Sequence, residues 1–236
     1  MSQVHPTAIV SAEARIGAGV SIGPFCVIGR CAIGVGTVIH SHVVIADGAE
    51  VGAGVEIFPG ALLGKDPKAA GATARLPEFD RRLQIGDGCS IGPHSILYYD
   101  VEVGPGTLIG DGASIREQCR IGAKCIISRY VTLNYNTKVG DGVKVMDGTH
   151  LTGNMIVGDD AFISALVVTL NDNVIRAGFG DHIVGPVVEP GAIVGGGATL
   201  MPGTVVGANA TVAAGAVVTR SVAADGRVAG VPAKPF

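Results

Sequence analysis

The sequence predicts an all-β fold, a parallel β-solenoid built on a repeat of six residues. Three observations predict it: an aliphatic residue recurs at multiples of six, Gly accounts for 37 of 236 residues, and Trp is absent. An aliphatic residue followed by Gly begins at Ile16, Ile22 and Ile28. The same pair, spaced by multiples of six residues, forms a second set: Ile85, Ile91, Val103, Ile109, Ile121, Val139 and Val157. In a third set an aliphatic residue recurs every six residues: Val194, Leu200, Val206, Val212 and Val218.

A period of six fits neither the 3.6-residue helix nor a long strand with a two-residue alternation. It fits a short strand and a tight turn, so that three successive hexapeptides close one triangular coil. One aliphatic side chain per six points inward, and small residues occupy bends that need a positive φ. Coils stack about 4.8 Å apart, so we expect about ten coils in a narrow prism. Another kind of β-solenoid remains the alternative.

Composition argues against several classes of protein. A net charge of −3 without basic clusters disfavours nucleic acid as a partner. Polar residues interrupt every apolar run short of the ~18 that span a bilayer, and residues 1–15 lack a signal-peptide pattern. We therefore expect no membrane span and a cytoplasmic location. The five cysteines have no CxxC spacing and are expected to be reduced and buried, and the six histidines predict no metal site.

Two segments break the phase of the repeat, at about 65–83 and at about 169–189. The step from Val157 to Val194 is one residue longer than a multiple of six. We expect residues 1–219 to form the β-helix with these two loops, and residues 220–236 to form a C-terminal extension. Loops on a regular scaffold often carry function, so candidate binding residues are sought there first.

The repeat resembles that of the left-handed parallel β-helix of bacterial acyltransferases, and the left hand is implied by this resemblance. Residues 5–9 (HPTAI) and 22–29 (IGPFCVIG) resemble the start of the UDP-N-acetylglucosamine acyltransferases. Residues 212–222 and 230–234 are similar to the closing coils of acetyltransferases that use acetyl-CoA. Residues 157–163 are similar to the sugar-nucleotide N-acetyltransferases of surface polysaccharide synthesis. The family also implies a homotrimer with active sites between neighbouring prisms.

One position departs from the family pattern. Many of these enzymes place a catalytic His five residues before the Gly of the coil that aligns with Val139 and Gly140, and here that position is Tyr135. Acylation of a sugar hydroxyl needs a base, whereas an amine is already partly free near neutral pH. The loss of the His therefore favours an amine as the acyl acceptor. The alternative is that the alignment is off by one coil and that His150 is the base.

The candidate catalytic residues are His150 to take the proton, Asn136 to orient the acceptor and Asp147 to hold its ammonium group. Asn and Asp are also favoured at bends for their φ alone. The candidate substrate-binding residues are polar side chains near the loops and basic side chains that could meet a pyrophosphate: Asn134, Asn154, Asn171, Asp172, Lys65, Arg75, Arg81 and Arg82. The resemblance places CoA at five further positions: Gly197, Ala198, Ala216, Arg220 and Lys234.

The expected function is that of an acetyl-CoA-dependent N-acetyltransferase acting on an amino sugar linked to a nucleotide. The amine would attack the thioester directly, with the protein supplying orientation and a hydrogen bond to the oxyanion. The partners would be these small molecules and two further copies of the chain. Two alternatives remain: an O-acyltransferase of the UDP-N-acetylglucosamine acyltransferase kind, and a non-catalytic β-helix scaffold.

Overall fold

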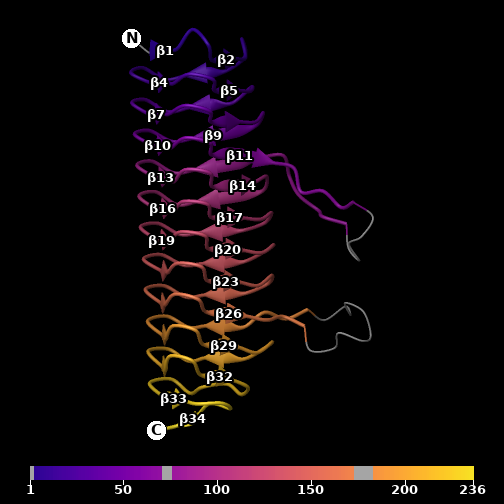
Figure 1. The fold of residues 1–236 in the computed structure, drawn as a ribbon, viewed down its shortest axis with the longest axis vertical. Helices are drawn as coiled ribbons and strands as arrows, with labels where there is room; N and C mark the ends of the chain where they lie inside the picture. The colour runs from indigo at the N-terminus through magenta and orange to yellow at the C-terminus, as the bar shows by residue number, and fades with distance from the viewer. Residues whose placement is uncertain (1–2, 71–75, 173–182) are drawn as a thin grey trace.

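The computed structural model describes residues 3–70, 76–172 and 183–236, and these form a long three-sided rod (Figure 1). The described residues contain short strands, turns and bends, and no helix. Each face of the rod is one sheet of parallel strands, apart from one antiparallel strand at the C-terminal end, as in a left-handed β-helix, which confirms the predicted all-β solenoid. No helix in the described part of the chain is long and apolar enough to cross a membrane.

The chain visits the three faces in turn, so that every third strand belongs to the same sheet, except for the last two strands, which both join the sheet called A below. Sheet A contains β1 (Gln3–Val4), β4 (Ser21–Ile22), β7 (Val38–Ile39), β10 (Glu56–Ile57), β13 (Ser90–Ile91), β16 (Leu108–Ile109), β19 (Ile126–Ile127), β22 (Lys144–Val145), β25 (Phe162–Ile163), β28 (Ile193–Val194), β31 (Thr211–Val212), β33 (Arg227–Ala229) and β34 (Lys234–Pro235). Sheet B contains β2 (Ile9–Val10), β5 (Val27–Ile28), β8 (Val44–Ile45), β11 (Leu62–Lys65), β14 (Ile96–Tyr98), β17 (Ser114–Ile115), β20 (Thr132–Leu133), β23 (His150–Leu151), β26 (Val168–Thr169), β29 (Thr199–Leu200) and β32 (Val217–Val218). Sheet C contains β3 (Arg15–Ile16), β6 (Ala32–Ile33), β9 (Ala49–Val51), β12 (Leu83–Ile85), β15 (Val101–Val103), β18 (Arg120–Ile121), β21 (Lys138–Val139), β24 (Ile156–Val157), β27 (Val187–Val188) and β30 (Val205–Val206).

The strand register follows the coil of three hexapeptides that the spacing predicts. Ile109 of β16 pairs with Ile127 of β19, three hexapeptides later. Near the N-terminus one coil is shorter by one residue, because Ile16 of β3 pairs with Ile33 of β6. This shorter coil explains why Ile33 follows Ile28 by five residues instead of six.

The interior of the rod is filled by the aliphatic side chains of the repeat. Ile109, Ile115 and Ile127 are fully buried, and the five cysteines are free and buried, as predicted. Most of the buried hydroxyl groups bond to backbone carbonyls; the Thr107 hydroxyl, for example, donates to the Gly122 carbonyl at 2.8 Å. Such bonds satisfy polar groups that would otherwise destabilise a dry core.

Glycines at the start of many bends allow the coils to stack closely. A Cβ at Gly122 would lie 2.6 Å from the carbonyl carbon of Gly140 in the next coil, too close for any side chain. The Asp141 carboxylate accepts a hydrogen bond from the Ala123 backbone nitrogen at 2.7 Å. The Gly-Asp pairs of the repeat thus have a structural role at the bends. The Gly lets two coils approach closely, and the Asp accepts a hydrogen bond from the backbone of the preceding coil.

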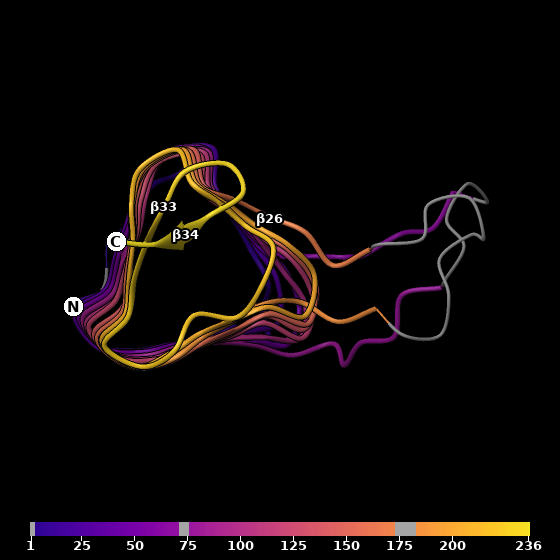
Figure 2. The ribbon, with the colours of Figure 1, turned by 90° about the horizontal axis from the view of Figure 1, so that it is seen from below.

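Both phase-breaking loops leave the rod from the same edge, where strands of sheet B lead into sheet C (Figure 2). The first joins β11 to β12, and the second joins β26 to β27. At the other end of the chain, β33 continues the parallel stack past residue 219 and β34 turns back antiparallel to it. Part of the C-terminal extension is therefore built into sheet A.

Candidate active site

The bends between sheets B and C form a column of polar side chains between the two loops, here called the B–C edge. Residues separated by three hexapeptides lie in successive coils of this column, because the strands on either side pair with that spacing. Its central members are Arg116, Glu117, Gln118, Asn134, Tyr135, Asn136, Thr152, Gly153 and Asn154. Three of the predicted residues, Asn134, Asn136 and Asn154, are therefore neighbours.

A cavity of about 350 Å³, here called the B–C pocket, opens between this column and the end of the first loop. The loop contributes one wall and the bends of three coils contribute the other. The lining residues are Leu76, Pro77, Glu78, Glu117, Gln118, Tyr135, Asn136 and Asn154. The pocket thus joins the first loop to coils that follow it much later in the sequence.

Two asparagines of the pocket form a hydrogen-bonded chain whose direction is fixed. The side-chain nitrogen of Asn154 donates to the backbone carbonyl of Ile183 at 2.9 Å, and a carbonyl can only accept. The Oδ1 of Asn154 then accepts from the side-chain nitrogen of Asn136 at 2.8 Å. Both residues have a positive φ, 52° for Asn136 and 62° for Asn154, which Asn tolerates well. The Oδ1 of Asn136 is therefore left as an acceptor.

Glu117 is the one charged residue among the buried residues that the structure describes, and only 3% of it is exposed. Its two carboxylate oxygens accept from Nε and Nη2 of Arg116 at 3.0 and 2.6 Å. Arg116 also donates to the side-chain oxygen of Asn134 at 3.1 Å. Sequence reasoning missed Arg116 and Glu117, although they lie one full coil before Asn134 and Tyr135, and this spacing could have found them.

Tyr135 is packed across the column. A Cβ on Gly153 would lie 2.6 Å from the Tyr135 ring, so the ring covers this glycine. Asn171, at the base of the second loop, donates to the Gly153 carbonyl at 3.1 Å and approaches the Tyr135 hydroxyl at 3.5 Å. The Arg116 guanidinium lies 5.7 Å from the ring centroid. Tyr135 therefore helps to join the bends to the loop.

His150 lies on β23, on the strand that leads into the bend of Asn154, and outside the lining of the B–C pocket. Its Nδ1 is 2.7 Å from the Thr132 hydroxyl. Burial lowers the pKa of the His150 imidazole because water no longer solvates the charged form. The ring is therefore neutral at pH 7, and it can accept a proton on Nε2 if Nδ1 carries the hydrogen that is donated to Thr132.

Asp147 lies on a different edge, in the bend between β22 of sheet A and β23 of sheet B. Its carboxylate accepts hydrogen bonds from Arg129, at 2.6 Å, and from the hydroxyl of Ser128. The Arg129 hydrogen bond is the main reason that the pKa of Asp147 is lowered. The structure thus does not bring Asp147 together with Asn136.

The predicted basic residues near the first loop have partners. Lys65 donates to the Tyr98 hydroxyl at 3.0 Å, and Arg81 pairs with Asp66 at 2.9 Å while its guanidinium lies 5.3 Å from the Tyr99 ring centroid. Arg82 lies 3.9 Å from the Glu50 carboxylate. Arg75 is outside the described residues. Asp172 follows Asn171 at the base of the second loop.

The residues expected to bind CoA are spread over the C-terminal coils. Gly197, Ala198 and Ala216 lie in bends between sheets A and B, and their backbone nitrogens donate to Ala165, Gly195 and Ala213. Arg220 lies in the bend that follows β32, and Lys234 lies in β34. On one prism, the bends of Gly197 and Ala216 occupy a different edge from the B–C pocket.

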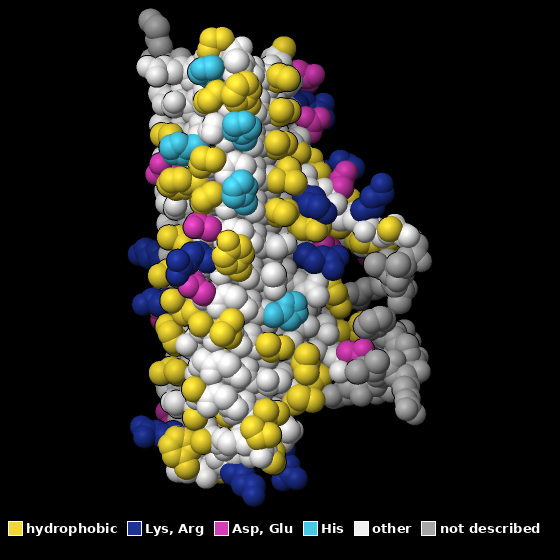
Figure 3. Space-filling view, in the orientation of Figure 1, with side chains coloured by type: hydrophobic (Ala, Val, Ile, Leu, Met, Phe, Trp, Pro, Cys, Tyr) yellow, Lys and Arg dark blue, Asp and Glu magenta, His cyan; other side chains and the backbone are white. Residues whose placement is uncertain are grey.

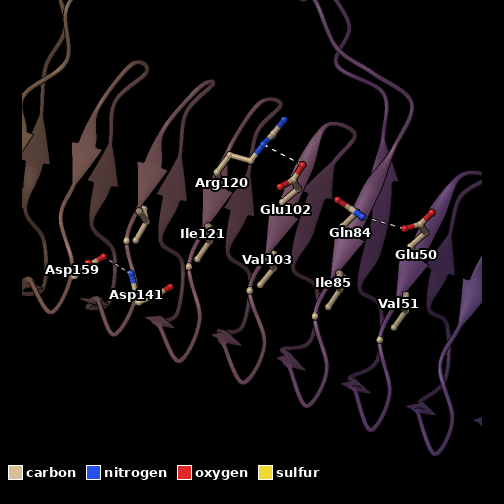
Figure 4. Close-up of a pocket in the computed structure, with 16 residues that line it drawn as sticks. Glu50, Val51, Gln84, Ile85, Glu102, Val103, Arg120, Ile121, Asp141 and Asp159 are labelled. Carbon is tan, nitrogen blue, oxygen red and sulfur yellow. Dashed lines mark hydrogen bonds and ion pairs between the residues drawn. The ribbon is translucent and has the colours of Figure 1, made fainter.

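A wider groove of about 640 Å³ runs along sheet C (Figure 4). Its outward side chains are paired with each other: Gln84 donates to Glu50 at 3.1 Å, and Arg120 lies 3.4 Å from Glu102. It contains none of the residues predicted to bind substrate. The B–C pocket is therefore the better candidate for an active site, although its volume is smaller.

Comparisons with known proteins give the same repeat. The family described as bacterial transferase hexapeptide (six repeats) matches residues 83–117 and 185–220. A curated relative, the acyl-(acyl-carrier-protein)–UDP-N-acetylglucosamine O-acyltransferase of Psychrobacter sp. (strain PRwf-1), is 51% identical over 43 residues. That match spans 18% of this chain and only 17% of the length of the relative.

Solved structures of UDP-N-acetylglucosamine acyltransferases share the fold over nearly the whole chain. The enzyme from Bacteroides fragilis has a TM-score of 0.58 at 22% identity, covering 99% of this chain and 74% of that one. The Arabidopsis enzyme has a TM-score of 0.57 at 22% identity (99% and 73%), and the Francisella novicida enzyme 0.54 at 24% identity (99% and 70%). The repeat and the fold together show a parallel β-helix with hexapeptide repeats, similar in fold to these acyltransferases.

Proposed function

We propose that the protein is an acyltransferase that uses acetyl-CoA to acetylate the amine of a nucleotide-linked sugar. The repeat family and the fold support acyl transfer in general. The observation that carries the choice of an amine is the B–C pocket, whose walls offer carboxylate and amide oxygens and where Tyr135 stands in place of a histidine base. The five buried, free cysteines fit a reducing cytoplasm.

In this reaction the amine nitrogen attacks the thioester carbonyl, a C–N bond forms, and the C–S bond breaks. The CoA thiolate leaves and takes up one proton. An acceptor that binds as ammonium must lose a further proton before the attack, and we assign its uptake to the neutral imidazole of His150. Asn136 and Asn154 orient the acceptor, while Asn134, Asn171 and Asp172 support the column. Holding the two reactants together contributes to the rate enhancement.

The donor is assigned to the C-terminal coils, with Arg220 and Lys234 as cations for the phosphates of CoA. Both residues are at least partly exposed, and Arg and Lys are the usual partners of phosphate. The backbone nitrogens of Gly197, Ala198 and Ala216 are already used within the prism, so contacts with the pantetheine arm would use other groups of these bends. Lys65, Arg81 and Arg82 remain the proposed partners of the sugar nucleotide's pyrophosphate.

A homotrimer completes the proposal, since the acceptor pocket and the bends of Gly197 and Ala216 occupy different edges of one prism. Two copies side by side could bring such edges together. Rows of hydrophobic side chains on the outer faces support self-association (Figure 3). On sheet B the first residue of each described strand points outward, and none of these residues is Asp, Glu, Lys or Arg. They are Ile9, Val27, Val44, Leu62, Ile96, Ser114, Thr132, His150, Val168, Thr199 and Val217.

A second candidate function is O-acylation with an acyl carrier protein as donor. It is favoured by the 43-residue match to the Psychrobacter enzyme, whose name describes such a reaction. The two functions differ in the acceptor atom: oxygen of a hydroxyl in one case and nitrogen of an amine in the other. A product ester is cleaved by mild base, whereas an amide is not.

A thiol-release assay tests the proposal. The protein is mixed with acetyl-CoA and a panel of UDP- and dTDP-linked amino sugars, and free thiol is followed with time. We expect release with at least one amino sugar and a base-stable product. Release only with hydroxyl sugars, or transfer only from an acyl carrier protein, would favour the second candidate, and no transfer from any donor would favour a scaffold.

A further inference from the structure

The lining of the B–C pocket is rich in hydrogen-bond acceptors. Its lining residues include the acidic Glu78 and Glu117 and the amides Gln118, Asn136 and Asn154, but no Lys, Arg or His. The Oδ1 of Asn136 is an acceptor, because the side-chain nitrogen of Asn136 is the atom that donates in the chain ending at the Ile183 carbonyl. The pocket therefore offers negative charge and acceptor atoms to whatever enters it.

Glu117 is the most firmly held of these acceptors. It is almost fully buried, and Arg116 holds both of its oxygens from outside the pocket lining. An ionised carboxylate oxygen accepts more than one hydrogen bond, so each oxygen keeps acceptor capacity beyond the bond to Arg116. A buried ion pair of this kind is weak evidence for stability, and a role in binding gives it a reason to be there.

A protonated amine is the ligand group that matches this lining. It carries a positive charge and three N–H donors and has no acceptor. A hydroxyl group has one donor and two lone pairs, and its lone pairs gain nothing from the Glu117 carboxylate and the Oδ1 of Asn136, which can only accept. A buried polar group without a partner lowers affinity substantially.

We infer that the carboxylate of Glu117 and the Oδ1 of Asn136 bind the ammonium group of the acceptor sugar, so that Glu117 selects an amine over a hydroxyl. This inference rests on the proposed function and deepens it by naming the acceptor-specificity residue. Residues 76–78 of the first loop line the same pocket, and Asn154 links the pocket to Ile183, on the chain that returns from the second loop.

Binding measured by calorimetry without any acyl donor tests this assignment. The ligand pairs are UDP-glucosamine with UDP-glucose, and dTDP-4-amino-4,6-dideoxyglucose with dTDP-6-deoxyglucose. For at least one pair, wild type is expected to bind the amine about tenfold more tightly, equal to about 1.4 kcal/mol. Glu117→Gln should lose that preference while binding the hydroxyl sugar unchanged. Glu13→Gln, which removes an exposed partner of Arg30 in an N-terminal coil, should keep it.

Gln118→Lys provides a second variant that leaves the pair of Arg116 and Glu117 intact. Gln118 lines the pocket with a positive φ of 63°, and Lys124 already adopts such a φ in this chain, at 55°. The added cation should abolish the preference for the amine by repulsion. Because the pair is intact, Gln118→Lys should unfold at a temperature within a few degrees of wild type.

Equal binding of amine and hydroxyl sugars by wild type, or no binding of either amine, would overturn the inference. So would a Glu117→Gln protein that keeps the full preference. The outcome is separable from the proposed function: a preference that depends on Glu117 without acetyl transfer would refute only the transferase, and transfer to an amine that ignores Glu117 would refute only the inference.

Discussion

The side-chain nitrogen of Asn154 donates to the backbone carbonyl of Ile183 across 2.9 Å, joining the last bend before the second loop to the chain that returns from that loop. Asn154 also accepts from Asn136, so the same contact fixes the direction of the whole amide chain. Asn154 thereby links the position of Ile183 to the orientation of the Asn136 amide, whose Oδ1 is the remaining acceptor.

Asn154→Asp removes this link with little change of shape. The new carboxylate cannot donate to Ile183, and two oxygens would face each other. We expect the specificity constant for acetyl transfer to fall about tenfold or more, in line with an unmade buried hydrogen bond. Steady-state kinetics measures the fall. Asn209→Asp, at another positive-φ bend outside the B–C edge, is the control and should be near wild type.

Gly153→Ala should displace the Tyr135 ring, which lies 2.6 Å from where the new Cβ would stand. We expect reduced transfer with the rod still folded, because Gly153 does not have a positive φ. In a Tyr135→Ala background the same substitution should have little further effect. Transfer rates of the four proteins form a double-mutant cycle, and additive effects would contradict the packing described.

His150 should make stability depend on pH. Its folded pKa is lower than the unfolded value of about 6.5, so below pH 6.5 the unfolded chain binds more protons than the native one. Stability from this group is present above pH 6.5 and is lost as the pH falls through the folded pKa. Denaturant unfolding at pH 7.5 and 5.0 should show a smaller loss for His150→Asn than for wild type.

The same variant tests the proposed proton transfer. If His150 takes the proton, His150→Asn should lower kcat by at least about tenfold, within the range of general base catalysis. Unchanged kcat across the pH range would remove His150 from the mechanism without affecting the assignment of the pocket.

Asp147→Asn should leave acetyl transfer unchanged, because its carboxylate is bound to Arg129 and Ser128 on the edge between sheets A and B. A loss of kcat with unchanged folding would show that this edge reaches an active site, as it could between two copies of the chain.

Inward and outward positions of one strand should respond differently to truncation. Ile109 is fully buried in β16, whereas its neighbour Leu108 is 41% exposed. Ile109→Ala is expected to lower the free energy of unfolding by about 2–5 kcal/mol, and Leu108→Ala by about 1 kcal/mol or less. Denaturant titration of the two variants provides the comparison, and equal losses would contradict the inward direction of Ile109.

The fold could be predicted because one physical requirement repeats. Each coil must bury an aliphatic side chain every six residues, and the positions of Ile109, Ile121 and Ile127 follow from that count. The shortened coil between Ile16 and Ile33 is a local exception. The spacing of the aliphatic residues shows that the repeat shifts by one residue there, but it does not explain why the coil is shorter.

The site could be predicted only in part. Asn136 and Asn154 stand one full coil apart, so their proximity follows from the repeat. The position of Glu117, one coil before Tyr135, follows in the same way, but its burial and its two bonds to Arg116 do not follow from period or composition. Residue type groups Asp147 with Asn136, but Asp147 follows a strand of sheet A and Asn136 a strand of sheet B, so the two lie on different edges.

A crystal structure with CoA and the amino sugar nucleotide tests the central claim most directly. The account predicts the sugar between the two loops, with its nitrogen within about 3 Å of Asn136 Oδ1 and a Glu117 oxygen. A sugar bound in the sheet C groove, or one that turns a hydroxyl toward Glu117 and its amine toward solvent, would contradict it.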